Sequence, residues 1–143
     1  MKDNIFKSSY EIDYNLIGIV SNLKEYKLAW VLNKIFSFDL QKVKNLKIKK
    51  QKRNFFEISN FLYQSDDYDI RLIKNKILRG TDIDEELYLI KNLSRFDYLF
   101  QIYDYRKKFN FNIIISKLNS ESSIQFANFV DINFVKEKDL LLI

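Results

Sequence analysis

The feature that most constrains the fold of this sequence is an uninterrupted helical pattern at residues 22–36, directly after an apolar run at residues 13–20. The run DYNLIGIV is apolar enough for a buried strand, and the stretch that follows contains neither glycine nor proline. Asn22 and Glu25 stand at the N-cap and N3 spacing of a capping box, which predicts where the helix starts. At about 100° per residue, four apolar side chains form a stripe that would face a core: Leu28, Val31, Leu32 and Ile35.

A second apolar patch lies on the same helix, on the far side of Lys27 and Lys34. It consists of Leu23, Tyr26 and Trp30. Either another segment of the chain packs over this patch, or the patch binds a partner or a second copy of the chain. Trp and Tyr are favoured anchors of such interfaces. The sequence leaves both interpretations open.

Runs rich in aromatic and β-branched residues dominate the rest of the chain and predict strands. We expect strands at approximately 43–50, 54–63, 68–77, 96–105 and 123–130, a turn at QSDD, and a second helix near 108–118. Residues 79–90 fit either a helix or a strand, and the apolar C-terminus DLLLI fits a last strand or a docked tail. A chain of 143 residues is long enough for one core. The prediction is therefore one α+β domain over residues 1–143, in which two main helices pack on a mostly antiparallel sheet of five to seven strands, compatible with ferredoxin-like layering.

The net charge of +5 comes from one segment. Residues 41–53 hold seven cations and no anion, whereas the remainder holds 17 cations and 19 anions. Lysines alternate with Leu46 and Ile48, which predicts a strand with one solvated face. This strand is expected to form one arm of a hairpin. A cluster of this kind is either the solvated tip of that hairpin or a phosphate-binding surface for RNA. The candidate nucleic-acid-binding residues are Lys47, Lys49, Lys50, Lys52 and Arg53.

The basic character is weak evidence of function, because the composition is dominated by residues with A/T-rich codons and lysine outnumbers arginine 19 to 5. Without histidine or cysteine, the chain has no Ser-His or Cys-His nucleophile and no zinc site of the usual ligand types. Its two glycines are too few for a phosphate-binding loop. The acidic turns SDDYD and DIDEE, at Asp66, Asp67, Asp69, Asp82, Asp84, Glu85 and Glu86, match no EF-hand loop and are expected to face water.

We therefore predict no catalytic residue, no metal site and no cofactor, and an enzyme is disfavoured. The longest uncharged stretch, YNLIGIVSNL, has ten residues, whereas a membrane-spanning helix needs about 20. The N-terminal residues lack the apolar core of an export signal. These patterns predict a cytoplasmic protein that does not enter a membrane.

Three stretches carry a resemblance to a known family: YNLIGIVSNLKEYKLAWVLNK at residues 14–34, IKNLSRFDY at 90–98 and KEKDLLLI at 136–143. They resemble the N-terminal strand and helix, the naming motif and the charged-then-apolar ending of the IPExxxVDY family, small proteins of Bacteroidota without an assigned function. Ile90, Asp97 and Tyr98 match the motif, whereas Lys91 and Asn92 replace its Pro and Glu and Phe96 replaces its Val.

The resemblance favours a strand at residues 87–90, a tight turn and the strand at 96–105, because proline suits the first turn after a strand. Asn92 could not replace a catalytic glutamate. The motif is thus expected to be structural, with Asp97 accepting backbone N–H groups beside the turn.

Two functional hypotheses follow. The first is a non-enzymatic cytoplasmic interaction module that binds a protein partner or itself through the patch of Tyr26 and Trp30. The alternative is an RNA- or ribosome-associated protein that binds through the basic hairpin at residues 42–53.

Overall fold

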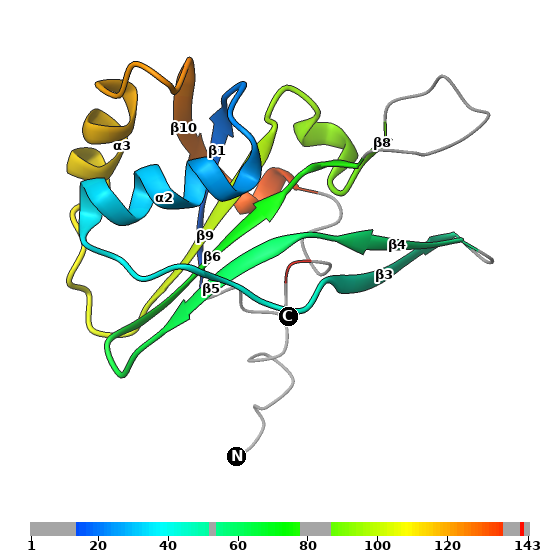
Figure 1. The fold of residues 1–143 in the computed structure, drawn as a ribbon, viewed down its shortest axis with the longest axis horizontal. Coiled ribbons are helices and arrows are strands. Elements are labelled where there is room, and N and C mark those ends of the chain that lie inside the picture. Colours follow the sequence, from blue (N-terminus) through cyan, green and yellow to red (C-terminus); the bar gives the residue numbers. More distant parts are fainter. Residues whose placement is uncertain (1–13, 52–53, 78–86, 136–140, 142–143) are drawn as a thin grey trace.

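The computed structural model of the chain describes residues 14–51, 54–77, 87–135 and 141. Figure 1 shows its elements, which are β1 (Asn15–Val20), α2 (Glu25–Phe36), β2 (Gln41–Lys42), β3 (Leu46–Gln51), β4 (Asn54–Ile58), β5 (Asn60–Gln64), β6 (Tyr68–Lys74), β7 (Lys76–Ile77), β8 (Leu87–Tyr88), η1 (Lys91–Leu93), β9 (Tyr98–Asp104), α3 (Phe111–Asn119), β10 (Phe126–Val130) and η2 (Ile132–Phe134). The predicted α+β class is confirmed.

The main sheet has six strands in the order β10-β1-β9-β6-β5-β2, and every neighbouring pair is antiparallel. β1 and β6 flank β9, and the chain between them contains α2 and then β2 to β5. β9 and β10 flank β1 and are joined through α3. This is the connectivity of a ferredoxin-like split βαβ arrangement. β5 and β2 extend it on one side, and two further pairs, β3 with β4 and β7 with β8, form short ribbons.

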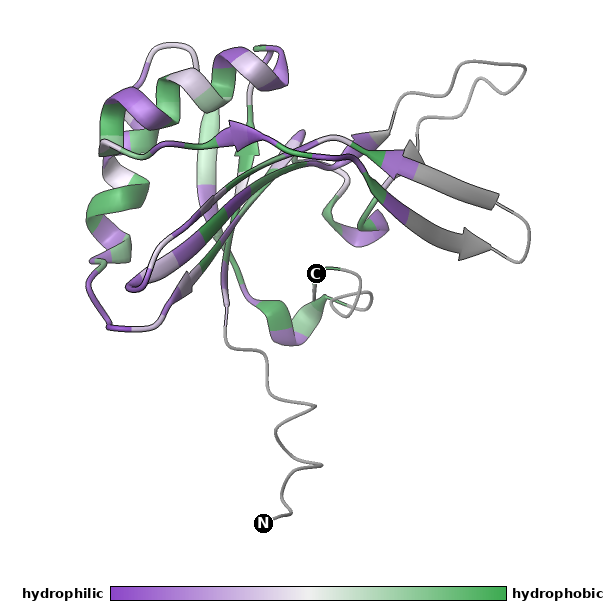
Figure 2. Cartoon of the chain, turned by 60° about the horizontal axis from the view of Figure 1, so that its bottom comes forward, coloured by the Kyte–Doolittle hydropathy of each residue, from purple (hydrophilic) through white to green (hydrophobic). Residues whose placement is uncertain are grey.

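The sheet has a hydrophobic core on each face. On one face, α2 and α3 pack against alternate residues of the strands through Leu28, Leu32, Ile114 and Leu118. Of the stripe predicted for α2, Val31 and Ile35 are only half-buried and lie outside this core. On the other face, the segment around η1, together with Val135 and Leu141, packs against Leu16, Ile73 and Leu99. Figure 2 shows the helices on one side of the sheet and the short η1 and η2 turns on the other. Within the described chain, no helix is long and apolar enough to cross a membrane.

The predicted strand 54–63 is interrupted at Ser59. Before the break, β4 pairs with β3 as the predicted hairpin, and after it β5 joins the main sheet beside β6. Buried Asn60 holds the junction, because its side chain donates to the carbonyl of Lys44 and accepts from Arg71 Nη1 at 2.6 Å. The sequence pattern did not distinguish one long strand from two short ones.

The predicted capping box is wrong. The N-cap of α2 is Lys24, whose side chain makes no capping hydrogen bond, and Glu25 is the first helical residue. The helix begins later because the preceding segment is tied to other parts of the chain, as described below.

The predicted connection from residues 87–90 to the strand at 96–105 also differs. β8 pairs with β7 in a separate ribbon, and η1 intervenes before β9 enters the main sheet. Residues 78–86 lie outside the described parts of the chain.

At the C-terminal end, Leu141 is fully buried and its carbonyl accepts from Gln101 Nε2 at 2.6 Å, so the apolar end contributes a docked contact at this residue.

Candidate interaction surface on helix α2

Two residues of the 90–98 motif fix the loop that leads into α2. The Tyr98 hydroxyl donates to the carbonyl of Leu23 at 2.6 Å, and Asp97 Oδ2 accepts from the backbone N–H of Ser21 at 3.0 Å. Asp97 thus accepts a backbone N–H as predicted, but from a residue 76 positions away rather than from its own turn. Burial, with the nearby charges of Glu25 and Asp97, raises the pKa of Tyr98 to about 12. The hydroxyl therefore stays protonated at neutral pH and donates a hydrogen bond to the loop.

Asn75, between β6 and β7, organises the rest of this motif and was not identified from the sequence. It is fully buried. Its side-chain oxygen accepts from the N–H of Ile90 at 2.9 Å, and its Nδ2 donates to the carbonyls of Leu93 and Phe96 at 3.0 Å each. Its backbone N–H donates to the carbonyl of Asp97 and its carbonyl accepts from Leu89. One asparagine thus connects both ends of the motif, and an asparagine in a polar stretch gives no sequence signal for this role.

The inner side of the α2 N-terminus carries a half-buried carboxylate. The Ser59 hydroxyl donates to Glu25 Oε1, whereas Glu25 Oε2 is buried without a hydrogen-bond partner. Burial raises the pKa of Glu25, an effect opposed by the Ser59 hydrogen bond and by Lys42 and Lys74. This carboxylate joins the helix to the break between β4 and β5, and it turns the only anion of α2 away from the outer face.

The raised pKa of Glu25 predicts how stability depends on pH. Because the folded protein holds this proton more tightly than the unfolded chain, the contribution of Glu25 to stability is greatest below its ordinary pKa of 4.5 and is lost as pH rises through the raised value. We expect Glu25→Gln to gain stability relative to the wild type as pH increases from 4 to 7, measured by urea unfolding at each pH. The exposed Glu57→Gln is the control for removing one negative charge. A constant difference between Glu25→Gln and wild type over this range would contradict the prediction.

The outer side of α2 carries the exposed aromatic residues. Tyr26 is 58% exposed and Trp30 is 62% exposed, one helical turn apart. Lys34 Nζ lies 5.1 Å from the centroid of the Trp30 ring. Leu23, the third member of the predicted patch, is half-buried and packs against the core beneath the helices. The structure therefore brings Tyr26 and Trp30 together on the surface and assigns Leu23 to the base of the helix.

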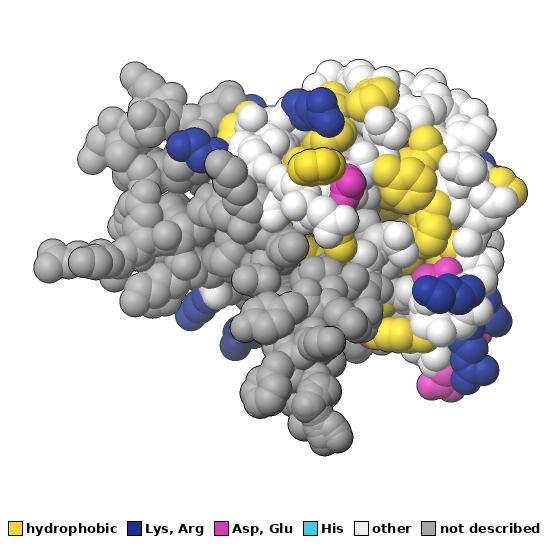
Figure 3. Space-filling view, turned by 180° about the vertical axis from the view of Figure 1, so that it is seen from behind, with side chains coloured by type: hydrophobic (Ala, Val, Ile, Leu, Met, Phe, Trp, Pro, Cys, Tyr) yellow, Lys and Arg dark blue, Asp and Glu magenta, His cyan; other side chains and the backbone are white. Residues whose placement is uncertain are grey.

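A second group of apolar side chains lies around β10. It consists of Ile113, Phe126, Phe129 and Phe134. Figure 3 shows hydrophobic side chains on the back of the molecule, over the region of β10. Two of these rings pack on other rings: Phe126 stacks on Phe96, and Phe129 meets Phe111 edge-on. Phe126 and Phe129 are therefore extensions of the core rather than free anchors.

The outer edge of β10 is blocked against the addition of another strand. The side-chain amide of Asn119, at the end of α3, accepts from the N–H of Ala127 at 2.9 Å and donates to its carbonyl at 2.8 Å. Asn128 Oδ1 accepts from the N–H of Phe129 at 2.9 Å. Because these edge groups are already paired, β10 is a poor template for an incoming strand.

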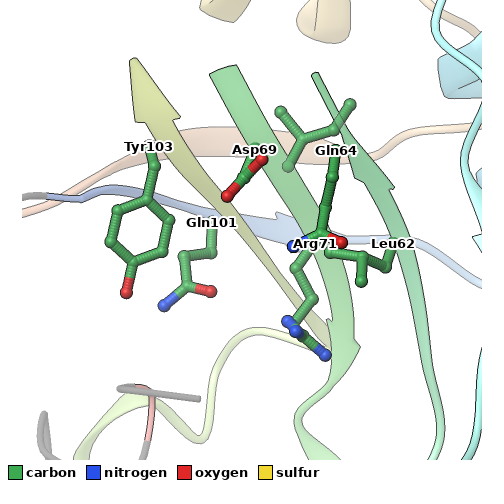
Figure 4. A pocket seen from close by; sticks show the side chains of 7 residues that line it. Leu62, Gln64, Asp69, Arg71, Gln101 and Tyr103 are labelled. Carbon is green, nitrogen blue, oxygen red and sulfur yellow. The ribbon is translucent and has the colours of Figure 1, made fainter. Parts of the chain in front are cut away.

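Neither of two hollows in the described part of the chain resembles an enclosed substrate site, because one is too small and the other is open to solvent. On the sheet face opposite the helices, seven residues line a cavity of about 30 Å³, enough for a water molecule (Figure 4): Leu62, Gln64, Asp69, Ile70, Arg71, Gln101 and Tyr103. A larger but open groove of about 630 Å³ runs between the start of β1 and the end of β10. Small-molecule sites usually enclose 300–1,000 Å³ and bury most of the ligand.

Two of the three acidic side chains in the turn at residues 66–69 are paired with other residues of the chain. Asp67 forms ion pairs with Lys108 at 2.6 Å and with Arg106 at 3.5 Å, and Asp69 Oδ2 accepts from the Tyr105 hydroxyl. Hydrogen bonding to Lys108 lowers the pKa of Asp67. Over the described residues, no group of three or more acidic side chains could hold a metal ion. The second acidic stretch, at residues 82–86, lies outside them.

The basic hairpin is described only in part. Lys44 and Lys47 are exposed, and Lys47 lies opposite the exposed Glu57 on β4, so an anion shares its position in the ribbon. The backbone of Lys49 and Lys50 is in β3, but their side chains, and all of Lys52 and Arg53, lie outside the described parts.

In comparisons with protein families, with curated proteins and with solved structures, nothing matched this chain. The resemblance to the IPExxxVDY family therefore stays a prediction.

Proposed function

We propose that this protein is a non-enzymatic interaction module that binds a protein partner, or a second copy of itself, through Tyr26 and Trp30 on the outer face of α2. The observation that carries the proposal is the exposure of these two aromatic side chains on a helix that is otherwise firmly anchored. Buried Trp and Tyr residues dominate the binding energy of many protein interfaces. A helix turn separates the two rings, so they can enter one hollow of a partner together.

The anchoring of α2 also supports the proposal. Tyr98, Asp97 and Ser59 hold the start of the helix through side-chain hydrogen bonds to residues 21–25. Little conformational freedom remains to be lost on binding, and such preorganisation favours affinity. The two rings project from a rigid base.

The experiment is to replace Trp30 with alanine. We expect the variant to stay folded, with a change in stability within about 0.5 kcal/mol, because the side chain is exposed. Its affinity should fall by about 30-fold or more, as for an interface anchor. Co-purification from native cytoplasm and light scattering report partner binding and self-association, respectively, and circular dichroism reports folding.

Phe134→Ala is the matched control, because Phe134 is 77% exposed and lies on η2, away from this helix. It should leave co-purification and self-association unchanged. Loss of folding in Trp30→Ala would instead assign Trp30 to the core. Retained binding by a folded Trp30→Ala variant would refute the proposal.

RNA binding through residues 42–53 is the alternative. It draws no specific support from Lys44 and Lys47, whose ribbon also carries Glu57. It stays a prediction, and an RNA probe is included in the experiment below.

A further inference from the structure

The outer face of α2 is positively charged as well as aromatic. Lys24, Lys27 and Lys34 are exposed around Tyr26 and Trp30. The only carboxylate between residues 21 and 38 is Glu25, and it is directed to Ser59 beneath the helix. Within residues 21–38, all of which the structure describes, the face therefore presents three cations, two aromatic rings and no anion.

Helix stability explains only Lys34, which lies in the last turn of α2 and complements the partial negative charge of the helix C-terminus. The N-terminus of a helix carries a partial positive charge, so cations in its first turn are unfavourable. Lys24 is the N-cap and Lys27 is the third helical residue. Among the described residues, neither forms an ion pair that would compensate. The number of lysines in this chain follows its composition, but their position in the first turn, around exposed rings, indicates a ligand of opposite charge.

We infer, on the basis of the proposed function, that the partner presents an acidic amphipathic segment to this face. Its apolar side chains cover Tyr26 and Trp30, and its carboxylates lie beside Lys24, Lys27 and Lys34. Lys34 already lies against the Trp30 ring, so the partner contacts the part of the ring that stays exposed. The aromatic rings provide affinity, and the lysines provide orientation and a faster association rate.

A protein segment fits this surface better than single-stranded RNA. Sites for single strands combine a charged groove with several stacking rings. The described hollows lie on the opposite face of the sheet and at the end of β1 and β10, and neither is lined by a residue of α2. The outer side of a single helix, with two rings one turn apart, instead matches the way helices bind to protein surfaces.

The chain offers a direct probe of this face, because Trp30 is its only tryptophan. We would titrate the full-length protein with three ligands: a synthetic amphipathic peptide of Glu and Leu, the same peptide with Gln in place of Glu, and an oligouridine of equal negative charge. The acidic peptide should shift the Trp30 emission to shorter wavelength. It should bind about tenfold more tightly than the Gln peptide, as expected from a few exposed ion pairs, and the difference should shrink as salt is added.

The variant pair Lys24→Glu with Lys27→Glu tests the position of the charge. Acidic residues suit the first turn of a helix, so this variant should fold at least as well as the wild type. It should lose the tenfold preference for the acidic peptide. Lys44→Glu with Lys47→Glu changes the net charge equally at the hairpin and should keep the preference.

Each other outcome has a definite meaning. Equal binding of the acidic and Gln peptides, equal losses in both variant pairs, tighter binding of oligouridine, or no shift with any ligand up to millimolar concentration would overturn the inference. The proposed function is judged separately, by whether Trp30→Ala abolishes co-purification or self-association. An acid-independent partner that depends on Trp30 would refute this inference and leave the interaction module standing.

Discussion

Replacing Asn75 with alanine is expected to lower the free energy of unfolding by about 3–5 kcal/mol, because several buried backbone groups lose their partner at once. The Asn75 side chain satisfies the N–H of Ile90 and the carbonyls of Leu93 and Phe96. Asn75, Ile90 and Phe96 are fully buried, so water does not readily replace the lost amide. Each buried group left unpaired costs about 1–3 kcal/mol. A loss of this size is a large part of the stability of an ordinary domain.

The measurement is urea unfolding followed by circular dichroism, with Asn92→Ala as the control. Asn92 is exposed and its amide donates to the carbonyl of Phe134 at 2.9 Å, so the same substitution there should cost less than about 1 kcal/mol. Asn75→Asp adds a second test. Aspartate keeps the acceptor for Ile90 but has no amide to donate to the two carbonyls, and its charge would be buried. This variant should be least stable at neutral pH and recover in part as the carboxyl group is protonated.

A loss below about 1 kcal/mol in Asn75→Ala would mean that the segment from Leu89 to Phe96 rearranges or admits water, and that Asn75 does not hold the motif.

Local patterns in the sequence predicted the elements, whereas contacts between distant residues decided how they were assembled. The apolar stripe around Leu28 and Leu32 is periodic along the chain, so the helix was predicted correctly. Its start was not, because the segment before it is held by Asp97 and Tyr98, about 75 residues away. No local pattern encodes such a contact.

The same distinction explains the outcome at the candidate site. The wheel of one helix grouped Tyr26 and Trp30 on one side but left open whether another segment covers them. Their exposure, like the burial of Leu23, depends on how the rest of the chain packs. The break at Ser59 also depends on a residue of another strand, because the side chain of buried Asn60 accepts a hydrogen bond from Arg71 on the neighbouring strand. Polar residues within strand-like runs, such as Asn60 and Asn75, were therefore the ones whose roles could not be inferred.

The second substitution for which we expect a large loss of stability is at Gly18, which lies against Phe96. A Cβ atom added at Gly18, in the middle of β1, would lie 2.4–2.5 Å from three atoms of the Phe96 ring. The ring is fully buried and stacks against Phe126, with Arg95 4.9 Å from its centroid. Because the ring cannot move aside freely, we expect Gly18→Ala to cost about 3 kcal/mol, at the upper end of the usual cost of overpacking.

A double-mutant cycle with Phe96→Val separates this steric effect from other consequences of changing Gly18. Valine stands at this position in the motif that the sequence resembles, and it is small enough to leave room above the strand. Phe96→Val alone should cost about 2–3 kcal/mol through the cavity it leaves. Combined with it, Gly18→Ala should cost at least about 1 kcal/mol less than it does in the wild type, because the added methyl group then fills part of that cavity. Additive costs measured by urea unfolding would show that the two residues do not constrain each other, and that the glycine in β1 is not required by the ring that lies on it.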